Sequence, residues 1–312
     1  MSSSLVLADK VPQTLKEKLK SDYQLYEYSR LSADEIRRLA AEVRVIVASG
    51  ESVVNAEFIS QFPQAKLIAV FGVGYDGIDI HTATEKGITV TNTPDILTDD
   101  VADLGMALIL SVSRQITAAE KFVEQGRWAS GSFPLASKVT GKRLGIVGYG
   151  RIGKAVARRA KGFAMPIACF NNSPVTDPEV TRYDSLITLA ENSDILVVCV
   201  SANPETRGLI NRQVLTALGP TGILINISRG SVTDEDAVVE AITRGEIGGA
   251  GLDVFAHEPQ VPAALLNRPD VVVTPHIASG THETRAAMAT LVADNISAYF
   301  SGQPLLTPVI SR

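Results

Sequence analysis

The segment Leu144-Gly-Ile-Val-Gly-Tyr-Gly-Arg-Ile-Gly153 lies near the middle of this 312-residue chain. Its glycines form a G-x-G-x-x-G pattern directly after an apolar, strand-like run, and residues 154–161 are typical of a helix. In such a turn the first glycine permits a tight bend, the second lets backbone approach a pyrophosphate, and the third lets helix and strand lie close. The helix N-terminus then favours the anion. The turn predicts dinucleotide binding through Gly148, Gly150, Arg151, Ile152 and Gly153.

Strand-like and helix-like runs alternate along most of the chain, which is typical of parallel α/β architecture. Strands are predicted before the glycine turn at 4–8, 23–28, 43–48, 66–71 and 88–91. After the strand at 144–147, further strands are predicted at 167–170, 195–200, 222–227, 249–253 and 271–275. Helices are predicted at 12–20, 33–42, 98–113, 154–161, 234–244 and 281–300.

A complete α/β unit precedes the glycine turn, and the chain is long enough for about two domains with full cores. We therefore predict an α/β fold of two Rossmann-like parallel-sheet domains with a cleft between them. The nucleotide-binding domain is inserted into a flavodoxin-like substrate domain, and the last helix crosses back. Residues 1–98, completed by 287–312, are predicted to form the substrate-binding domain, and residues 99–286 the dinucleotide-binding domain.

The composition is that of an ordinary globular protein, with 45% hydrophobic and 20% charged residues. A net charge of −5 argues against nucleic acid as a partner, because nucleic acid requires a basic face. No apolar run approaches the length of a bilayer span, and the N-terminus has no pattern of a secretory signal, so we expect no membrane association. The only cysteines, Cys169 and Cys199, are interpreted as small core residues in a reducing compartment, which predicts a cytoplasmic protein.

The loop after the strand at 167–170 bears on the choice of cofactor. A fold selective for NAD places Asp or Glu about 20 residues beyond the glycines, where the carboxylate binds the ribose 2′-hydroxyl. Here Asn171, Asn172 and Ser173 occupy that loop, and no acidic residue appears before Asp177. A cation at Arg151 opposes the helix dipole unless an anion lies there. The loop and Arg151 predict NADP(H) as the preferred cofactor, with NAD(H) as the alternative, although the loop contains no Arg or Lys to bind a phosphate.

Three later segments follow predicted strands and carry charged or titratable residues: Arg229, Glu258 and His276. Open α/β sheets bind ligands at this edge. A guanidinium binds a carboxylate bidentately and polarises an adjacent carbonyl, while an imidazolium protonates the carbonyl oxygen as hydride reaches carbon. A carboxylate beside the histidine sets its tautomer and favours its charged form. The set is what reduction of a 2-oxo acid requires, and no metal-ligand spacing is apparent.

At these residues the chain resembles the D-isomer-specific 2-hydroxyacid dehydrogenases over nearly its whole length. The motifs that carry the resemblance occur in family order: 145–153, Asn226-Ile-Ser-Arg-Gly230, Gly251-Leu-Asp-Val-Phe255 with Glu258-Pro259, and Thr274-Pro-His276. The resemblance implies that His276 is the acid/base, that Glu258 is its partner and that Arg229 anchors the substrate. It also implies that Asp253 contacts the nicotinamide end of the cofactor. The backbone of Val73 and Gly74 is implied to hold the substrate carboxylate.

Within the family the resemblance is to glyoxylate/hydroxypyruvate reductases and hydroxyphenylpyruvate reductases, on the stretch 126–135 and the non-acidic loop at 171–173. It implies reduction of small 2-oxo acids to D-2-hydroxy acids, and a homodimer formed through the region 98–123. The rival enzyme is an NAD-dependent 2-hydroxyacid dehydrogenase. The rival from another class is a non-catalytic NAD(P)H-sensing protein, against which the complete set of Arg229, Glu258 and His276 argues.

Overall fold

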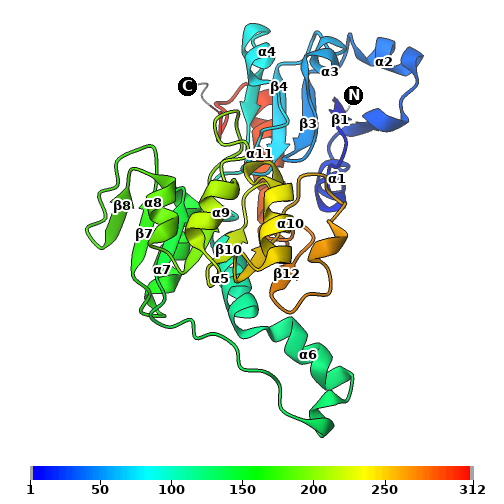
Figure 1. The fold of residues 1–312 in the computed structure, drawn as a ribbon. Helices are drawn as coiled ribbons and strands as arrows, with labels where there is room; N and C mark the ends of the chain where they lie inside the picture. Colours follow the sequence, from blue (N-terminus) through cyan, green and yellow to red (C-terminus); the bar gives the residue numbers. More distant parts are fainter. Residues whose placement is uncertain (1–2, 310–312) are drawn as a thin grey trace. The chain divides into compact units, whose positions relative to one another are not determined.

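The structure, a computed structural model, describes residues 3–309 of the chain (Figure 1). By its internal contacts the chain forms two compact units: the described residues up to Leu97 together with those from Ser279 onward, and Thr98–Ala278. The division after Ala278 falls eight residues before the predicted one at 286 and 287. The reason is that helix α11 (His282–Phe300) packs as a whole against α1 (Gln13–Leu19) and β4 (Leu67–Phe71) of the first unit.

The first unit is built on a five-stranded sheet in the order β2-β1-β3-β4-β5, and all of its strand pairs are parallel. This is the flavodoxin-like order. The remaining strands are β1 (Ser4–Leu7), β2 (Gln24–Glu27), β3 (Val45–Ser49) and β5 (Thr89–Thr91). Its other helices are α2 (Ala33–Leu39), α3 (Ala56–Ser60), α4 (Ile80–Glu85) and the 3-10 turn η1 (Tyr28–Arg30). Every residue of β3 and β4 is buried, which explains their continuous apolar sequences.

The second unit contains a seven-stranded parallel sheet in the order β12-β11-β10-β9-β6-β7-β8. Its strands are β6 (Leu144–Val147), β7 (Ile167–Phe170), β8 (Val180–Tyr183), β9 (Ile195–Val198), β10 (Ile223–Asn226), β11 (Gly249–Leu252) and β12 (Val271–Val273). Its helices are α5 (Thr98–Arg114), α6 (Ile116–Glu124), α7 (Arg151–Lys161), α8 (Leu186–Glu191), α9 (Arg212–Leu218) and α10 (Glu235–Arg244). Short 3-10 turns complete it: η2 (Arg127–Ser130), η3 (Gly230–Val232) and η4 (Ala263–Leu265).

Within the second sheet the strand order reverses between β6 and β9, which is the topological switch point of a doubly wound sheet. Helix α5 packs against β10 and β11, whereas α8 packs against β6 and β7. The side chains of β6, β9, β10 and β11 are buried throughout. The architecture confirms the predicted pair of parallel-sheet α/β domains, and each predicted strand is present.

One strand was absent from the prediction. Strand β8 pairs with β7 at the edge of the second sheet, and its sequence Val-Thr-Arg-Tyr exposes Thr181 and Arg182. Because the two central residues of this edge strand are exposed, its sequence contains no apolar run, and hydrophobic patterning does not reveal the strand.

The long helix predicted from Thr98 ends at Arg114, and Gln115 with a φ of 50° turns the chain into α6. Helix α6 and the turn η2 project from the unit as an arm (Figure 1). Among the described residues no single helix has the length and composition of a membrane span. Only α5 and α6 together reach them, and they are bent by 59°.

Candidate active site

The glycine turn joins β6 to α7 at the switch point of the second sheet. Gly148 has a φ of +94°, and a Cβ there would lie 2.9 Å from the Val200 nitrogen. A Cβ on Gly153 would lie 2.2 Å from the Gly148 carbonyl oxygen, so this glycine is required for the close approach of helix and turn. By contrast, a Cβ built on Gly150 would have no atom within 4 Å among the described residues beyond its own chain neighbours.

Gly150 is the N-cap of α7 and offers no side chain to the first helical turn, which also lacks acidic residues. Space in front of the cap, an open helix N-terminus and the absence of a nearby carboxylate in the first turn together suit a pyrophosphate. The residues present therefore fit a dinucleotide. Ile152 is half-buried in that first turn, and Arg151 is exposed.

The loop after β7 is tied to the glycine turn by Asn171. Its Oδ1 accepts a hydrogen bond from the Tyr149 N–H at 2.9 Å, and its Nδ2 donates to the Ser173 carbonyl oxygen at 2.9 Å. Asn172 and Ser173 are exposed. The structure thus brings the predicted residues of the turn and of the loop together. The side chain of Asn171 itself orders the loop, and Asn172 and Ser173 present the exposed polar groups.

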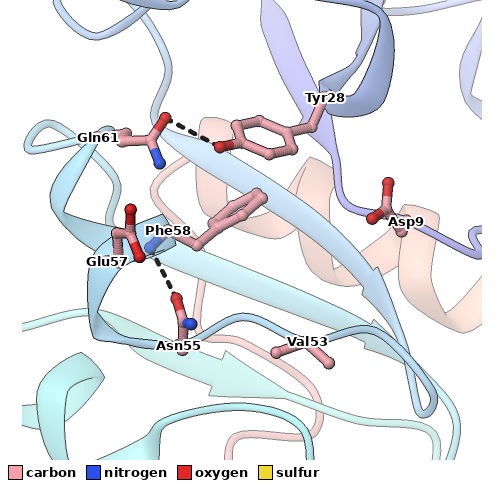
Figure 2. A pocket seen from close by; sticks show the side chains of 7 residues that line it. All are labelled: Asp9, Tyr28, Val53, Asn55, Glu57, Phe58 and Gln61. Carbon is pink, nitrogen blue, oxygen red and sulfur yellow. Dashed lines mark hydrogen bonds between the residues drawn. The ribbon is translucent and has the colours of Figure 1, made fainter.

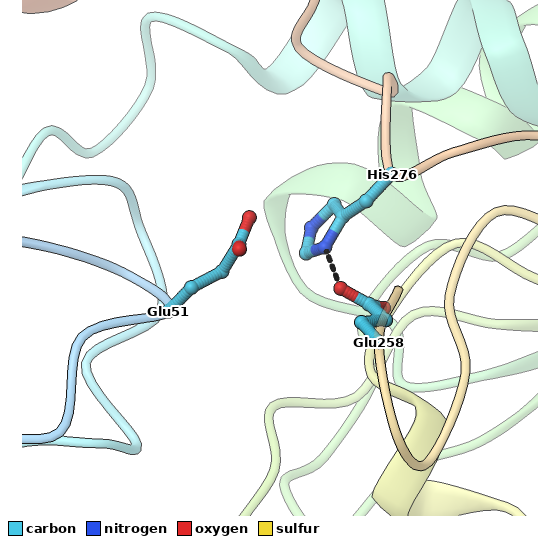
Figure 3. A group of neighbouring side chains, drawn as sticks. All are labelled: Glu51, Glu258 and His276. Atoms are coloured by element: carbon cyan, nitrogen blue, oxygen red, sulfur yellow. Dashed lines mark hydrogen bonds and ion pairs between the residues drawn. The ribbon is translucent and has the colours of Figure 1, made fainter. Parts of the chain in front are cut away.

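At the other end of the same sheet edge, His276 and Glu258 form a hydrogen-bonded pair (Figure 3). The distance from His276 Nδ1 to Glu258 Oε2 is 2.8 Å, and the side chains are 24% and 22% exposed. Glu258 Oε1 accepts the Phe255 N–H at 3.0 Å, so both carboxylate oxygens are engaged. Glu51, also drawn in Figure 3, belongs to the first unit.

The electrostatics of this pair favour an ionised carboxylate. Burial acts to raise the pKa of Glu258, but the hydrogen bonds from His276 and from the Phe255 N–H outweigh it. The positive charges of His276 and Arg229 lower it further, so the pKa of Glu258 lies below its ordinary value. Because an ionised carboxylate only accepts hydrogen bonds, the Nδ1 atom of His276 carries the proton of this hydrogen bond, which orients the imidazole ring.

Asp253 follows β11 and is completely buried. Its Oδ1 accepts hydrogen bonds from the Thr274 hydroxyl at 2.6 Å and the Ile277 N–H at 2.9 Å, and its Oδ2 accepts the Ala278 N–H at 3.0 Å. Its carbonyl oxygen accepts the His276 N–H at 2.9 Å. Burial raises the pKa of Asp253, against the lowering effect of these hydrogen bonds. The carboxylate therefore holds the loop on both sides of His276, whose own φ is 53°.

Arg229 lies at the end of β10, in a loop that Asn226 organises. The Asn226 side chain is fully buried, accepts the Ser228 N–H at 3.0 Å and donates to the Arg229 carbonyl oxygen at 3.0 Å. A Cβ on Gly230 would lie 1.9 Å from the Phe255 carbonyl carbon, so this loop lies directly against the segment that leads to Glu258. Arg229, Glu258 and His276 thus meet at one edge. Asn226 lies within one of the family motifs, but its residue type and position alone do not mark it as a site residue, since an asparagine at a strand end has many uses.

Val73 and Gly74 belong to the loop after β4 in the first unit. The Val73 carbonyl oxygen accepts a hydrogen bond from Asn92 Nδ2 at 2.9 Å, and the Asn92 carbonyl oxygen in turn accepts the Thr307 hydroxyl at 2.6 Å. The loop is half-buried and is anchored on β5 and on the chain after α11. These hydrogen bonds hold the loop in place within that unit.

The remaining histidines, His81, His257 and His282, are exposed, as expected for residues outside the site. Cys169 is buried and Cys199 is partly buried, both as free thiols, which agrees with their interpretation as core residues.

A cavity of about 220 Å³ opens in the first unit (Figure 2). Residues that follow β1, β2 and β3 line it: Asp9, Tyr28, Val53, Asn55, Glu57, Phe58 and Gln61. None of the predicted site residues lines this cavity, and its Tyr28 hydroxyl donates to Gln61 Oε1 at 3.0 Å.

Comparison with known proteins identifies the family to which this chain belongs. Residues 106–278 match the D-isomer specific 2-hydroxyacid dehydrogenase family at its NAD binding domain. The chain belongs to this family, and it is an NAD(P)-dependent oxidoreductase of the two-domain α/β class.

Particular relatives extend over almost the whole chain. The hydroxyphenylpyruvate reductase of Plectranthus scutellarioides is 48% identical over 95% of this chain and 95% of its own length. Glyoxylate/hydroxypyruvate reductase A of Arabidopsis thaliana is 46% identical over 86% of each chain. Among solved structures, the NADPH-dependent glyoxylate/hydroxypyruvate reductase of Sinorhizobium meliloti, in complex with NADP and malonate, superposes with a TM-score of 0.92 at 40% identity, covering 99% of this chain and 97% of that one.

Proposed function

We propose that this protein is an NADPH-preferring reductase that converts small 2-oxo acids, such as glyoxylate, hydroxypyruvate and phenylpyruvate, to D-2-hydroxy acids. The observation that carries the proposal is the hydrogen bond between His276 and an ionised Glu258 beside Arg229. The relatives named above are reductases of such 2-oxo acids, and the matched structure contains NADP.

The chemistry assigns a separate role to each side chain. Arg229 binds the substrate carboxylate and polarises the adjacent carbonyl, because a guanidinium presents paired donors in a plane. His276 donates the Nε2 proton to the carbonyl oxygen, and Glu258 stabilises the imidazolium from the Nδ1 side. The nicotinamide, when bound, supplies hydride to the carbonyl carbon. Asp253 positions the His276 loop, and its predicted contact with the nicotinamide end of the cofactor remains part of this proposal.

The remaining contacts follow from the same assignment. The backbone N–H groups of Val73 and Gly74 hold the substrate carboxylate, because small residues let an anion approach backbone. The first unit is the substrate-binding domain and the second the dinucleotide-binding domain. Gly148, Gly150, Gly153 and Ile152 hold the pyrophosphate. Arg151 and the loop Asn171–Ser173 face the ribose phosphate.

We propose in addition that the protein acts as a homodimer in the cytoplasm. The arm formed by α6, η2 and the following chain exposes large apolar side chains: Ile116, Val123, Trp128 and Leu135 are 50%, 55%, 69% and 99% exposed. Several large exposed apolar residues on one projecting segment suit an interaction surface, and a second copy of the chain presents the same arm.

The deciding experiment follows the loss of NADPH absorbance with hydroxypyruvate, glyoxylate and phenylpyruvate as acceptors, and repeats each assay with NADH. Turnover that is faster with NADPH supports the proposal, and the ratio among acceptors names the substrate. Faster turnover with NADH would favour the NAD-dependent dehydrogenase. Cofactor binding without turnover of any 2-oxo acid would favour the sensing protein.

A further inference from the structure

The loop Asn171–Ser173 leaves the proposed preference for NADPH without a cation of its own. Neutral side chains avoid repelling a 2′-phosphate, but they do not compensate its charge of about −1.5 to −2. Discrimination between NADPH and NADH requires an attractive partner for that phosphate, and Arg is the side chain best suited to it. The sequence around the loop contains no arginine or lysine between Gly162 and Arg182.

Strand β8 places a cation at this loop, in addition to Arg151 of the glycine turn. It lies beside β7 at the edge of the second sheet (Figure 1), in a parallel register that sets Arg182 opposite Cys169. From there Arg182 reaches along the sheet, and its Nε donates a hydrogen bond to the Asn171 carbonyl oxygen at 3.2 Å. The guanidinium therefore lies at the loop, although its residue number is eleven positions later.

We propose that Arg182 binds the 2′-phosphate of NADPH from the side of the loop, beside Arg151, and thereby determines the cofactor preference. The inference rests on the proposed function. It assigns to this chain a specificity residue that comes from the neighbouring strand rather than from the loop itself.

The present partners of Arg182 leave it able to take this role. Its Nη1 contacts Asp184 Oδ1 at 2.8 Å, but the side chain of Asp184 is 87% exposed and that of Arg182 is 38% exposed. Exposed ion pairs contribute little, so the guanidinium exchanges this carboxylate for a doubly charged phosphate at small cost. A guanidinium has five N–H donors, more than these two contacts use.

The other acidic group close to the loop is already engaged. Asp177 accepts the Tyr149 hydroxyl at 3.0 Å and lies 3.9 Å from Lys161 Nζ. The hydrogen bonds that Asp177 accepts from the Glu179 N–H and the Tyr149 hydroxyl lower its pKa. Asp184 is therefore the carboxylate that competes with a phosphate for Arg182. Replacing it with a neutral residue should strengthen phosphate binding, whereas replacing Arg182 should weaken it.

The test measures binding rather than turnover. Adenosine 2′,5′-bisphosphate and 5′-AMP are titrated by calorimetry into the full-length protein, and NADPH and NADH are titrated by their fluorescence. For Arg182→Ala we expect binding of the bisphosphate and of NADPH to weaken about tenfold, with 5′-AMP and NADH within about twofold. Arg182→Lys keeps the charge but loses the planar donors, so its affinities for the bisphosphate and for NADPH should lie between those of wild type and of Arg182→Ala. Asp184→Asn strengthens bisphosphate binding about twofold to fivefold.

Arg244→Ala is the matched control. It removes an arginine of the same unit that carries the same charge and is also ion-paired, with a side chain 62% exposed against 38% for Arg182, and it leaves all four dissociation constants unchanged. Equal weakening of both nucleotides in Arg182→Ala, or no weakening, would overturn the assignment, as would an Asp184→Asn variant without effect. If wild type reduces hydroxypyruvate with NADPH in these cases, the proposed function stands and only the role of Arg182 fails. If wild type neither prefers NADPH nor reduces a 2-oxo acid, the proposed function itself fails.

Discussion

The two ends of one sheet edge in the second unit differ in how their polar groups are satisfied. At the β10–β12 end, Asp253 and Asn226 are fully buried, and their side chains hold the loops that carry His276 and Arg229. At the β6–β8 end, Arg151, Asn172 and Arg182 are exposed. The first end is held by buried hydrogen bonds within the protein, whereas the second is an exposed polar surface that, under the proposed function, the cofactor completes. Substitutions at the first end should damage rate and stability, and those at the second end should change affinity.

The largest effect is expected from His276→Asn. Asparagine tolerates the positive φ of this position, so the loop is retained while the proton donor is lost. We expect kcat to fall about 10²- to 10⁴-fold, which is the usual contribution of a general acid. The measurement is the rate of NADPH oxidation with hydroxypyruvate, with the NADPH dissociation constant as the control. A kcat within threefold of wild type would remove His276 from the chemistry and break the contrast between the two ends.

Asp253→Asn should affect both rate and stability. One carboxylate oxygen becomes an NH₂ group, so at least one of the donors from Thr274, Ile277 and Ala278 loses its acceptor in a buried site. A buried donor without a partner costs about 1–3 kcal/mol. We expect a lower free energy of unfolding in urea and a fall in kcat through displacement of His276. Thr274→Val, which removes only one of the three donors, should cost less. Loss of stability with kcat unchanged would show that Asp253 does not position the histidine.

The pH dependence of stability should reveal Glu258. A carboxyl whose pKa is lower in the folded than in the unfolded state stabilises the fold at pH above its unfolded value, about 4.3. That contribution is lost as the pH falls through the folded-state pKa. Glu258→Gln should therefore be less stable than wild type at pH 7, by about 1–2 kcal/mol, and the difference should narrow below pH 4. Urea unfolding at a series of pH values tests this. A difference that is constant with pH would mean that the pKa of Glu258 is not shifted by folding.

The smallest effect on the protein itself is expected from Gly150→Ala. The added methyl group meets no atom of the described chain, so the free energy of unfolding should change by no more than about 0.5 kcal/mol. NADPH should bind more weakly, because the methyl group occupies the space in front of the helix N-terminus. Gly153→Ala is the contrasting variant, since its methyl group would lie 2.2 Å from a carbonyl oxygen and should destabilise the fold. Unaltered NADPH affinity in Gly150→Ala would place the cofactor elsewhere.

Sequence patterning was most informative where the structure depends only on consecutive residues. The glycine turn joins a strand, a turn and a helix in consecutive residues, so its geometry follows from local rules. The predicted central strands are buried and continuous in hydrophobicity, which the sequence displays directly. Patterning was least informative at β8, where exposed Thr181 and Arg182 hide an edge strand, and at Gln115, where a single backbone rotation splits a helix.

The order of Arg229, Glu258 and His276 at the ends of three strands, together with the glycine turn, was sufficient to identify the family and the class of reaction. Both identifications depend on residues whose chemical role follows from residue type and from spacing along the sequence. The fold alone determined how they are held: Asn226 and Asp253 act across loops, and Arg182 reaches Asn171 from a neighbouring strand. These contacts join residues that are brought together by loop packing and sheet pairing, and linear spacing carries no record of them.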